Sequence, residues 1–466
     1  MLVLFSCFIQ LACSISFCPA TSAERGHDQP DKAVPDLGTR RGGVDWPCFL
    51  GPKGTSESSE KGIVQTWSRD GLRLVWQLPL GSGYGMPVVS KGRLYQFDRV
   101  GTKARLRCLN SETGTALWEF EYPTDYQDFF GYNNGPRCSP VVNDGRVYIY
   151  GPEGMLHCLG AEDGSLLWKV DTKADFGVVQ NFFGVGSTPA IEGDLLIAQV
   201  GGSPAGEGPV PSMRQKGNGS GIVAFDKKTG KIRYRITDEL ASYASPVMAT
   251  IAGRRWCFVF ARGGLVGFEP NSGKIDFQFP WRARVLESVN ASDPLVVGDR
   301  VFISETYGPG SALLKVETGA SHLVWSDADR RRDKALQCHW MTPIHVDGYI
   351  YGSSGRHTEE AELRCIELAT GKVMWSEPGL TRSALLLVDG FLICLSETGP
   401  LRLLRVNSGK FDEVSRLDFV WEKKGGELLR LAPLLRPPCW AAPILSHGLL
   451  YVRGDNRLLC LELIPQ

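Results

Sequence analysis

The sequence lacks an excess of charge of either sign, because its 51 Lys and Arg residues balance 51 Asp and Glu residues. A chain without net charge has no overall field that would attract nucleic-acid phosphates or an anionic membrane surface. We therefore expect no nucleic-acid partner. The basic run at residues 330–332 lies between Asp329 and Asp333, which favours a solvated loop over an anion site.

Long apolar runs are also missing after the first 23 residues, so we expect no transmembrane segment. Residues 1–23 are apolar and end in small residues, with Thr21 and Ala23 suitably placed for cleavage. This pattern is typical of a secretory signal, although no Lys or Arg precedes its apolar part. We expect an exported protein of the periplasm or the extracellular space, with association to the cell envelope as an open alternative.

The chain has neither an adjacent pair of cysteines nor a Cys-x-x-Cys motif. Cys338, His339 and Cys439 stand in loops that could meet, but without that spacing or a fourth ligand we expect no metal site. Four other cysteines recur at one position of a repeated strand, which favours small buried packing residues over disulfides. They are Cys108, Cys158, Cys365 and Cys460.

Helical periodicity is scarce, whereas 54 glycines accompany many short apolar segments. From residue 67 onward one pattern recurs at intervals of about 50 residues, which is typical of a propeller or a solenoid. Its clearest copy, residues 139–168, contains a strand that follows a proline, a turn, two further strands and a Gly-x-x-x-Trp segment. Asp144 and Gly145 supply the positive φ of a tight hairpin turn.

Eight copies of the pattern follow one another. One copy keeps the turn at Asp389 and Gly390 but has Leu385 where a proline is expected, and the last copy ends without its Gly-x-x-x-Trp strand. Residues 73–80 resemble that missing strand. Residues 67–466 therefore predict an all-β fold: an eight-bladed β-propeller of four-stranded antiparallel blades, closed by an N-terminal strand pairing with the C-terminal blade. The other seven copies open at Pro87, Pro140, Pro189, Pro246, Pro294, Pro343 and Pro443.

The Gly-x-x-x-Trp segments resemble the tryptophan-docking repeats of the quinoprotein alcohol dehydrogenase-like superfamily, and most of all the PQQ-like (pyrrolo-quinoline quinone) repeat propellers of the BamB-like family. They end at Trp118, Trp168 and Trp375, with aromatic variants at Tyr234 and Phe277.

Upstream, the W-P-x-F-x-G-P segment of residues 46–52 is similar to the leader of exported PQQ-like proteins. We expect the leader, residues 24–66, to be partly disordered, because residues 24–45 have few apolar positions.

The resemblance leaves open whether the protein binds a cofactor. Quinoprotein dehydrogenases hold calcium with carboxylate and amide oxygens, place an aspartate beside the quinone and often use paired cysteines. Glu287, Asn290 and Asp293 could imitate the calcium set, but their spacing favours turn and edge roles. We therefore expect no catalytic residue, no metal and no cofactor, with PQQ and calcium as the alternative.

A candidate binding site lies at the mouth of the central channel, where the residues just before each innermost strand gather. Aromatic and Arg side chains of this kind are enriched at binding hot spots, although they could equally fill and solvate the channel. Three long inserts, at residues 121–137, 171–188 and 202–220, are expected on the same face. The predicted site residues are Tyr84, Arg137, Tyr243, Asn290, His339, Arg382 and Trp440.

These observations predict an exported, monomeric, non-catalytic scaffold that binds a protein or peptide partner of the cell envelope. One alternative is a PQQ-dependent alcohol or sugar dehydrogenase. Another is a glycan-binding module, because the first insert combines aromatic rings with Asn133 and Asn134. The fold alone does not choose among the three.

Overall fold

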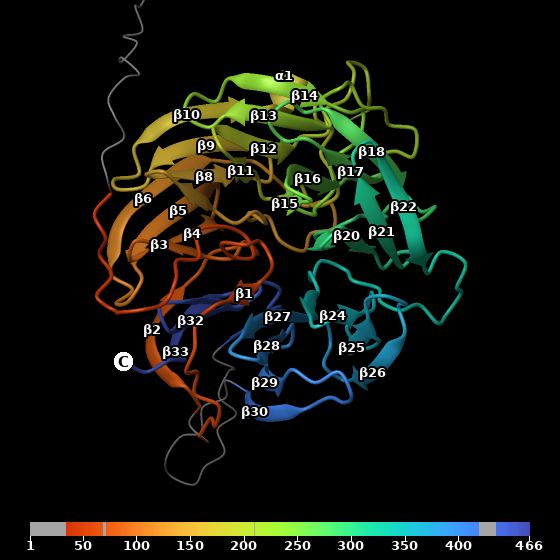
Figure 1. The fold of residues 1–466 in the computed structure, drawn as a ribbon. Helices are drawn as coiled ribbons and strands as arrows, with labels where there is room; N and C mark the ends of the chain where they lie inside the picture. The colour runs from red at the N-terminus through yellow and green to blue at the C-terminus, as the bar shows by residue number, and fades with distance from the viewer. Residues whose placement is uncertain (1–33, 69–70, 209, 419–434) are drawn as a thin grey trace, which may run out of the picture. The chain divides into compact units, whose positions relative to one another are not determined.

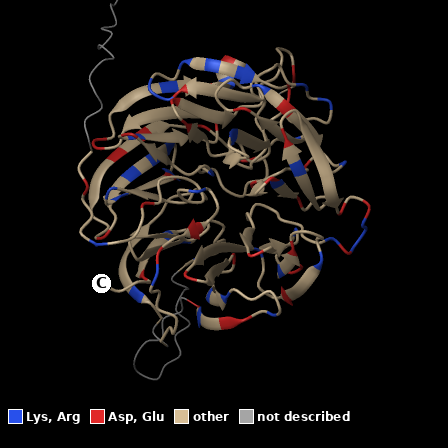
Figure 2. Cartoon of the chain, in the orientation of Figure 1, with Lys and Arg blue, Asp and Glu red and all other residues tan. Residues whose placement is uncertain are grey.

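The computed structural model describes residues 34–68, 71–208, 210–418 and 435–466. Its strands form eight sheets that follow one another around a ring, an eight-bladed β-propeller (Figure 1), so the predicted fold class is confirmed. No helix in these ranges is long and apolar enough to cross a membrane. The predicted signal segment lies outside the described residues. Lys and Arg are interspersed with Asp and Glu around the blades (Figure 2).

In blades 1 to 6 the four antiparallel strands follow in chain order from the innermost to the outermost, whereas blade 8 takes its outermost strand from the N-terminal side and blade 7 gains a parallel strand. Blades 1 to 4 consist of β3 (Val88–Ser90), β4 (Arg93–Val100), β5 (Lys103–Asn110), β6 (Ala116–Pro123); β7 (Val141–Asn143), β8 (Arg146–Tyr150), β9 (Met155–Gly160), β10 (Leu166–Asp171); β11 (Ala190–Glu192), β12 (Leu195–Gln199), β13 (Ile222–Asp226), β14 (Ile232–Ile236); and β15 (Val247–Ile251), β16 (Arg254–Phe260), β17 (Gly264–Phe268), β18 (Ile275–Pro280). A short helix, α1 (Thr172–Phe176), follows β10.

The second half of the ring repeats this order. Blades 5 to 8 consist of β19 (Leu295–Val297), β20 (Arg300–Ser304), β21 (Ser311–Glu317), β22 (Ala320–Ser326); β23 (Ile344–Val346), β24 (Tyr349–Ser354), β25 (Glu362–Glu367), β26 (Val373–Pro378); β27 (Ser383–Val388), β28 (Phe391–Ser396), β29 (Leu401–Arg405), β30 (Glu413–Leu417); and β31 (Ile444–Ser446), β32 (Leu449–Arg453), β33 (Arg457–Glu462) with β2 (Arg73–Pro79). The leader adds β1 (Glu57–Ser58) to blade 7.

The ring closes as predicted, because β2 is the outermost strand of the last blade. It pairs antiparallel with β33, and Trp76 lies opposite Cys460. The pairing removes an exposed sheet edge and ties the two ends of the repeat region together. The predicted hairpin turns are also present: Asp144 and Gly145 both have positive φ, at 46° and 73°.

An aromatic ring on the outermost strand of a blade packs against a turn glycine of the next blade. Trp76 of blade 8 lies so close to Gly114 of blade 1 that a Cβ there would be 2.9 Å from the indole, and Trp118 meets Gly164 in the same way. The Trp76 indole also donates its Nε1–H to the carbonyl of Ser111 at 2.9 Å. Burial of each such ring contributes roughly 1.5–3 kcal/mol, so these aromatics fasten neighbouring blades together.

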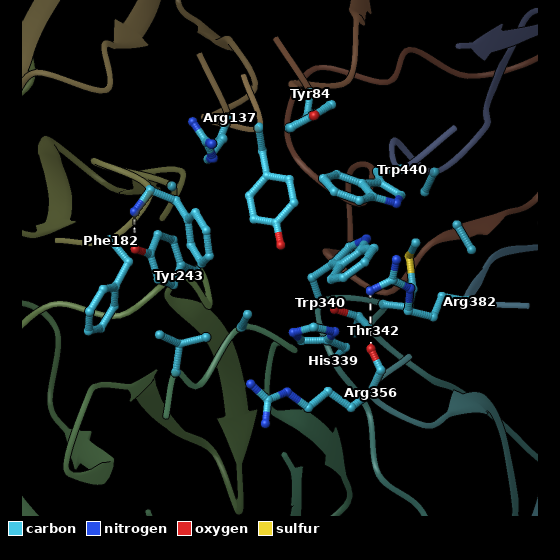
Figure 3. Close-up of a pocket in the computed structure, with 18 of the residues that line it drawn as sticks. Tyr84, Arg137, Phe182, Tyr243, His339, Trp340, Thr342, Arg356, Arg382 and Trp440 are labelled. Carbon is cyan, nitrogen blue, oxygen red and sulfur yellow. Dashed lines mark hydrogen bonds between the residues drawn. The ribbon is translucent and has the colours of Figure 1, made fainter. Parts of the chain in front are cut away.

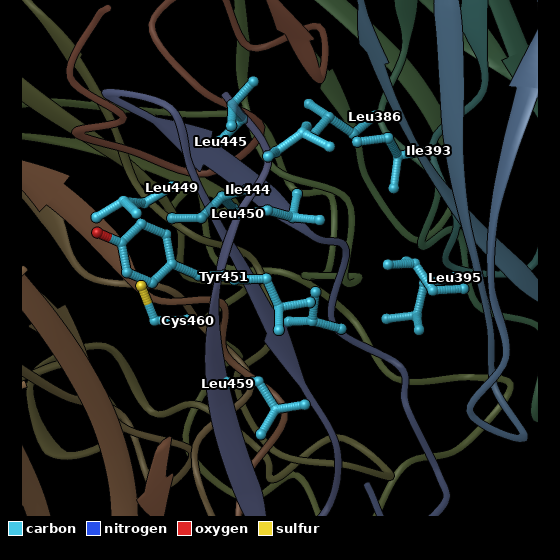
Figure 4. Packing of buried hydrophobic residues seen from close by; sticks show 14 of the residues in the cluster. Leu386, Ile393, Leu395, Ile444, Leu445, Leu449, Leu450, Tyr451, Leu459 and Cys460 are labelled. Atoms are coloured by element: carbon cyan, nitrogen blue, oxygen red, sulfur yellow. The ribbon is translucent and has the colours of Figure 1, made fainter. Parts of the chain in front are cut away.

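Buried aliphatic residues fill the space between blades 7 and 8 (Figure 4), where Leu386, Ile393 and Leu395 face Leu450. The four equivalent cysteines are fully buried, as predicted for packing residues.

From Val34 onward the leader is held against the blades by specific contacts, which its polar composition did not indicate. Trp46 is fully buried and bridges Val89 of β3, while the Pro47 carbonyl accepts the N–H of Val142 in blade 2. Farther along, β1 pairs in parallel with β27. The leader therefore lies against the innermost strands of blades 1, 2 and 7, inside the central channel (Figure 1).

Blade 7 differs from the others because the leader pairs with it. Leu385 occupies the position of the usual proline, and its carbonyl accepts the Ser56 hydroxyl at 2.7 Å. The N–H of Leu387 donates to the Ser56 carbonyl at 2.9 Å. The unusual repeat therefore marks the place where a fifth strand joins the sheet.

Candidate functional site

A cavity of about 380 Å³ lies where the segments before the innermost strands converge (Figure 3). The residues around it come from every part of the ring, because each blade brings one such segment to the axis. Six of the seven predicted site residues line it: Tyr84, Arg137, Tyr243, His339, Arg382 and Trp440.

Asn290 is the exception, because it is fully buried and does not line the cavity. Its side-chain amide donates to the carbonyls of Ala261 at 2.7 Å and Trp281 at 3.1 Å. These hydrogen bonds attach the segment before the innermost strand of blade 5 to blade 4. Asn290 therefore has a structural position outside the lining of this cavity.

The leader contributes Phe49 and Leu50 to the cavity wall, next to Met86 and Leu385. Since the leader also bonds to the innermost strands of several blades, it narrows the channel at this point. The cavity thus has an apolar lining from the leader as well as from the blades.

Two of the three inserts reach the cavity, as expected. The first supplies Phe130 and Tyr132, and the second supplies Phe182 and Phe183. The ring centroids of Phe130 and Phe183 are 5.5 Å apart, so the inserts pack on each other. The third insert does not line this cavity; its Gln215 lines a second, smaller one of about 30 Å³.

Two indoles and a guanidinium form one wall. The rings of Trp340 and Trp440 are 4.7 Å apart, and the Arg382 guanidinium lies 4.5 Å from the Trp340 ring. Glu397 holds this arrangement: it pairs with Arg382 at 2.6 Å and accepts the Trp440 Nε1–H at 2.9 Å. Burial alone would raise the pKa of Glu397, but these hydrogen bonds bring it below its ordinary value.

Two further arginines face the cavity, and their guanidinium groups differ in the partners that they have. Arg137 pairs with the buried carboxylate of Asp128 and lies over the rings of Tyr84 and Phe183. Arg356 lies 4.5 Å from the Tyr307 ring, is exposed, and has no ion pair within the described part of the chain. Arg356 is therefore the guanidinium best able to meet an anionic group of a ligand.

His339 is unsuited to acid–base chemistry at neutral pH. Burial, reinforced by Arg382 and Arg356, lowers the pKa of its imidazole to about 3. Its Nε2 lies 3.1 Å from the Tyr307 hydroxyl, and the two rings meet edge to face. The neutral imidazole therefore serves as a polar part of the wall.

A family model described as "Outer membrane protein assembly factor BamB" matches residues 102–377. The chain belongs to this family. Among curated proteins no sequence relative matches.

Solved structures agree with the BamB-family fold. BamB from Moraxella catarrhalis is 13% identical, with a TM-score of 0.53 over 85% of this chain and 98% of that chain. Quinohemoprotein alcohol dehydrogenase from Comamonas testosteroni is 12% identical, with a TM-score of 0.59 over 89% of this chain and 80% of that chain. At these identities the likeness shows the propeller alone, and a binding scaffold and an enzyme both have this architecture.

Glu287, Asn290 and Asp293, the three residues that could imitate a calcium set, do not all line the cavity. Burial raises the pKa of Asp293 to about 8, and its carboxyl accepts the Ser245 N–H at 2.7 Å. Asn290 and Asp293 are buried and do not line the cavity, whereas Glu287 does. No cluster of three or more His, Cys, Asp or Glu that could hold a metal occurs in the ranges that the structure describes.

Several residues that line the axial cavity were not predicted from the sequence. Trp340 directly follows the predicted His339, so its place beside a predicted mouth residue was the available signal. Arg356 and Tyr307 lie in turns between the second and third strands of their blades, not before an innermost strand. Phe49 belongs to the leader, which no repeat pattern places at the axis.

Proposed function

We propose that this BamB-family propeller is a non-catalytic binding scaffold of the cell envelope, and that its axial cavity receives a segment of a protein partner. The observation that carries the proposal is the lining of the cavity: indole, phenol and phenyl rings surround a space of about 380 Å³, with Arg356 at its edge lacking an ion pair among the described residues. Such a lining suits a peptide with an aromatic side chain and a nearby carboxylate.

The cellular setting is part of the same proposal. Residues 1–23 have the pattern of a secretory signal, and the family is described by an outer-membrane assembly factor. We propose that the exported protein acts as a monomer, without PQQ or calcium. Light scattering of the purified protein would test whether it is a monomer.

Site-specific photo-crosslinking in the native host tests the binding site. A photoreactive residue replaces Tyr132, which is 63% exposed at the cavity, and in a matched control replaces Ile232, which is 53% exposed on the outermost strand β14. We expect one partner to be captured from position 132, identified by mass spectrometry, and lost when Trp440→Ala is added. Equal capture at both positions, or capture that ignores Trp440→Ala, contradicts the proposal.

The dehydrogenase alternative has its own test. Purified protein is incubated with PQQ and Ca²⁺, and dye reduction is followed across a panel of alcohols and sugars. We expect no turnover above the rate of the free cofactor, because Glu287 lines the cavity whereas Asn290 and Asp293 are buried outside its lining. Clear turnover ends the scaffold proposal.

A further inference from the structure

A buried guanidinium lies beside the second cavity, away from the walls already described. Arg262 follows β16 in the turn that leads to β17, and only 3% of the residue is exposed. Its neighbours around this space of about 30 Å³ are mostly apolar residues, glycine and proline, and the uncharged polar ones include Asn181, Gln199 and Gln215.

The protein satisfies this guanidinium poorly. One terminal nitrogen donates to Gln215 Oε1 and the other to the Leu286 carbonyl, both at 3.4 Å, and the Nε–H has no acceptor among the described residues. Arg282 adds a second positive charge nearby, and its guanidinium donates to the same Leu286 carbonyl at 3.2 Å. Burial, reinforced by Arg282, lowers the pKa of Arg262 to about 10.

The nearest carboxylates are occupied elsewhere. Glu239 accepts the backbone N–H of Gly263 at 2.8 Å. Glu153 lines the cavity but accepts the hydroxyls of Tyr122 at 2.7 Å and Thr124 at 3.0 Å. No ion pair joins Arg262 to any acidic residue of the described ranges.

Three other arginines of the described ranges are buried and show how this group is satisfied elsewhere. Arg93 donates to the carbonyl of Pro35, and Arg453 donates to the carbonyls of Gly83 and Gly85. Arg402, 5% exposed, pairs with Glu413 at 3.1 Å. Buried charges in proteins are paired, because an isolated ion loses its hydration without compensation. Arg262 has no carboxylate partner among the described residues, and both of its acceptors lie at 3.4 Å. Because it borders an enclosed space, we expect the missing partner in that space.

We propose that the second cavity binds a small inorganic anion of the size of chloride, held by the Arg262 guanidinium. A water-sized body needs roughly 10–15 Å³ of such space, so a monatomic anion fits, whereas a larger organic anion does not. Lys173 on the cavity wall adds to the positive potential. This site is independent of the scaffold proposal, because it requires no partner protein.

An anion bound in the second cavity would also affect the larger, axial cavity. The Arg262 guanidinium lies 5.7 Å from the centroid of Phe182, a ring that lines the larger cavity. An anion that fixes Arg262 therefore stabilises one wall of the axial site.

The test uses the full-length protein exchanged into gluconate buffer. Sodium bromide is titrated at constant ionic strength while Tm is measured, and crystals grown in bromide are examined for an anomalous peak. We expect a saturable rise in Tm of about 2 °C or more, absent in Arg262→Met, and a bromide peak beside the guanidinium. Arg402→Met, which removes a buried arginine that has a carboxylate partner, keeps the bromide response.

An unchanged bromide response in Arg262→Met overturns the proposal, as does a crystal whose cavity holds water and no bromide. If Arg262→Met does not fold, the anomalous map of the unaltered protein decides alone: a peak at Arg262 supports the site and its absence refutes it.

Discussion

Trp440 and Glu397 are linked by a hydrogen bond of 2.9 Å from the indole Nε1–H to Oε2, although 43 residues separate them in the chain. The same carboxylate pairs with Arg382, whose guanidinium lies over both indoles of the cavity wall. One buried acid therefore sets the positions of the two predicted site residues Arg382 and Trp440. This arrangement leads to the first prediction.

Glu397→Gln keeps the shape of the side chain but removes the charge that Arg382 and Trp440 share. We expect a loss of about 2 kcal/mol in the free energy of unfolding, measured by urea denaturation, because hydrogen bonds to a charged group are replaced by neutral ones. The control is Glu317→Gln, where the carboxylate and its partner His322 are each 60% exposed. That change should stay within about 0.5 kcal/mol. Equal losses would show that Glu397 is not the organising acid.

Arg356→Gln tests the ligand side of the cavity. Because Arg356 is exposed and has no ion pair in the described part of the chain, stability should change little, whereas affinity for the captured partner should fall about 10-fold. The partner peptide identified by crosslinking is titrated by fluorescence anisotropy. Arg405→Gln, which removes a guanidinium lying over Phe391 outside the cavity, should leave affinity unchanged. Unaltered binding by Arg356→Gln would remove the anionic contact from the proposal.

Gly114→Ala tests the docking of Trp76 across the closure of the ring. Both Gly114 and the control Gly193 have positive φ, at 72° and 55°, so alanine strains the backbone at either position. Only at Gly114 would the new Cβ meet the indole, at 2.9 Å, because nothing lies within 4 Å at Gly193. We expect Gly114→Ala to cost about 1–3 kcal/mol more than Gly193→Ala in thermal or urea unfolding. Equal costs would mean that the aromatic contact does not fasten the blades.

His447 and Asp45 join the leader to the last blade, with Nε2 and Oδ1 3.0 Å apart. The hydrogen bond with Asp45 raises the pKa of His447 to about 9, above the ordinary value of 6.5. Because the folded state binds the proton more tightly, the stabilisation is complete below pH 6.5 and is lost as the pH rises to about 9. After solvent screening we expect about 1–2 kcal/mol, measured as the difference between the unaltered protein and His447→Gln across this range. The exposed His322→Gln should show no such difference, and a pH-independent gap for His447→Gln would contradict the assignment.

The propeller could be predicted from the repeat pattern, because each element of the repeat acts locally. Asp-Gly pairs adopt the backbone of tight turns, alternating apolar strands form a sheet, and an aromatic at the end of an outermost strand meets the glycine of the next blade. Eight such units and one displaced strand at residues 73–80 are enough to predict a closed ring. Most of the mouth residues followed from the same periodicity.

Which of those side chains enclose a cavity depends on contacts between different blades and with the leader, and these contacts are visible in the folded chain alone. Asn290 has the expected place in the repeat, yet its amide turns to two buried carbonyls, a choice made by partners 29 and 9 residues away in the chain. Phe49 reaches the axis because Trp46 and β1 attach the leader to blades 1 and 7. Such contacts join segments that belong to different repeats or to the leader, so no local pattern encodes them. For the same reason Arg262 and its cavity could not be predicted from the sequence.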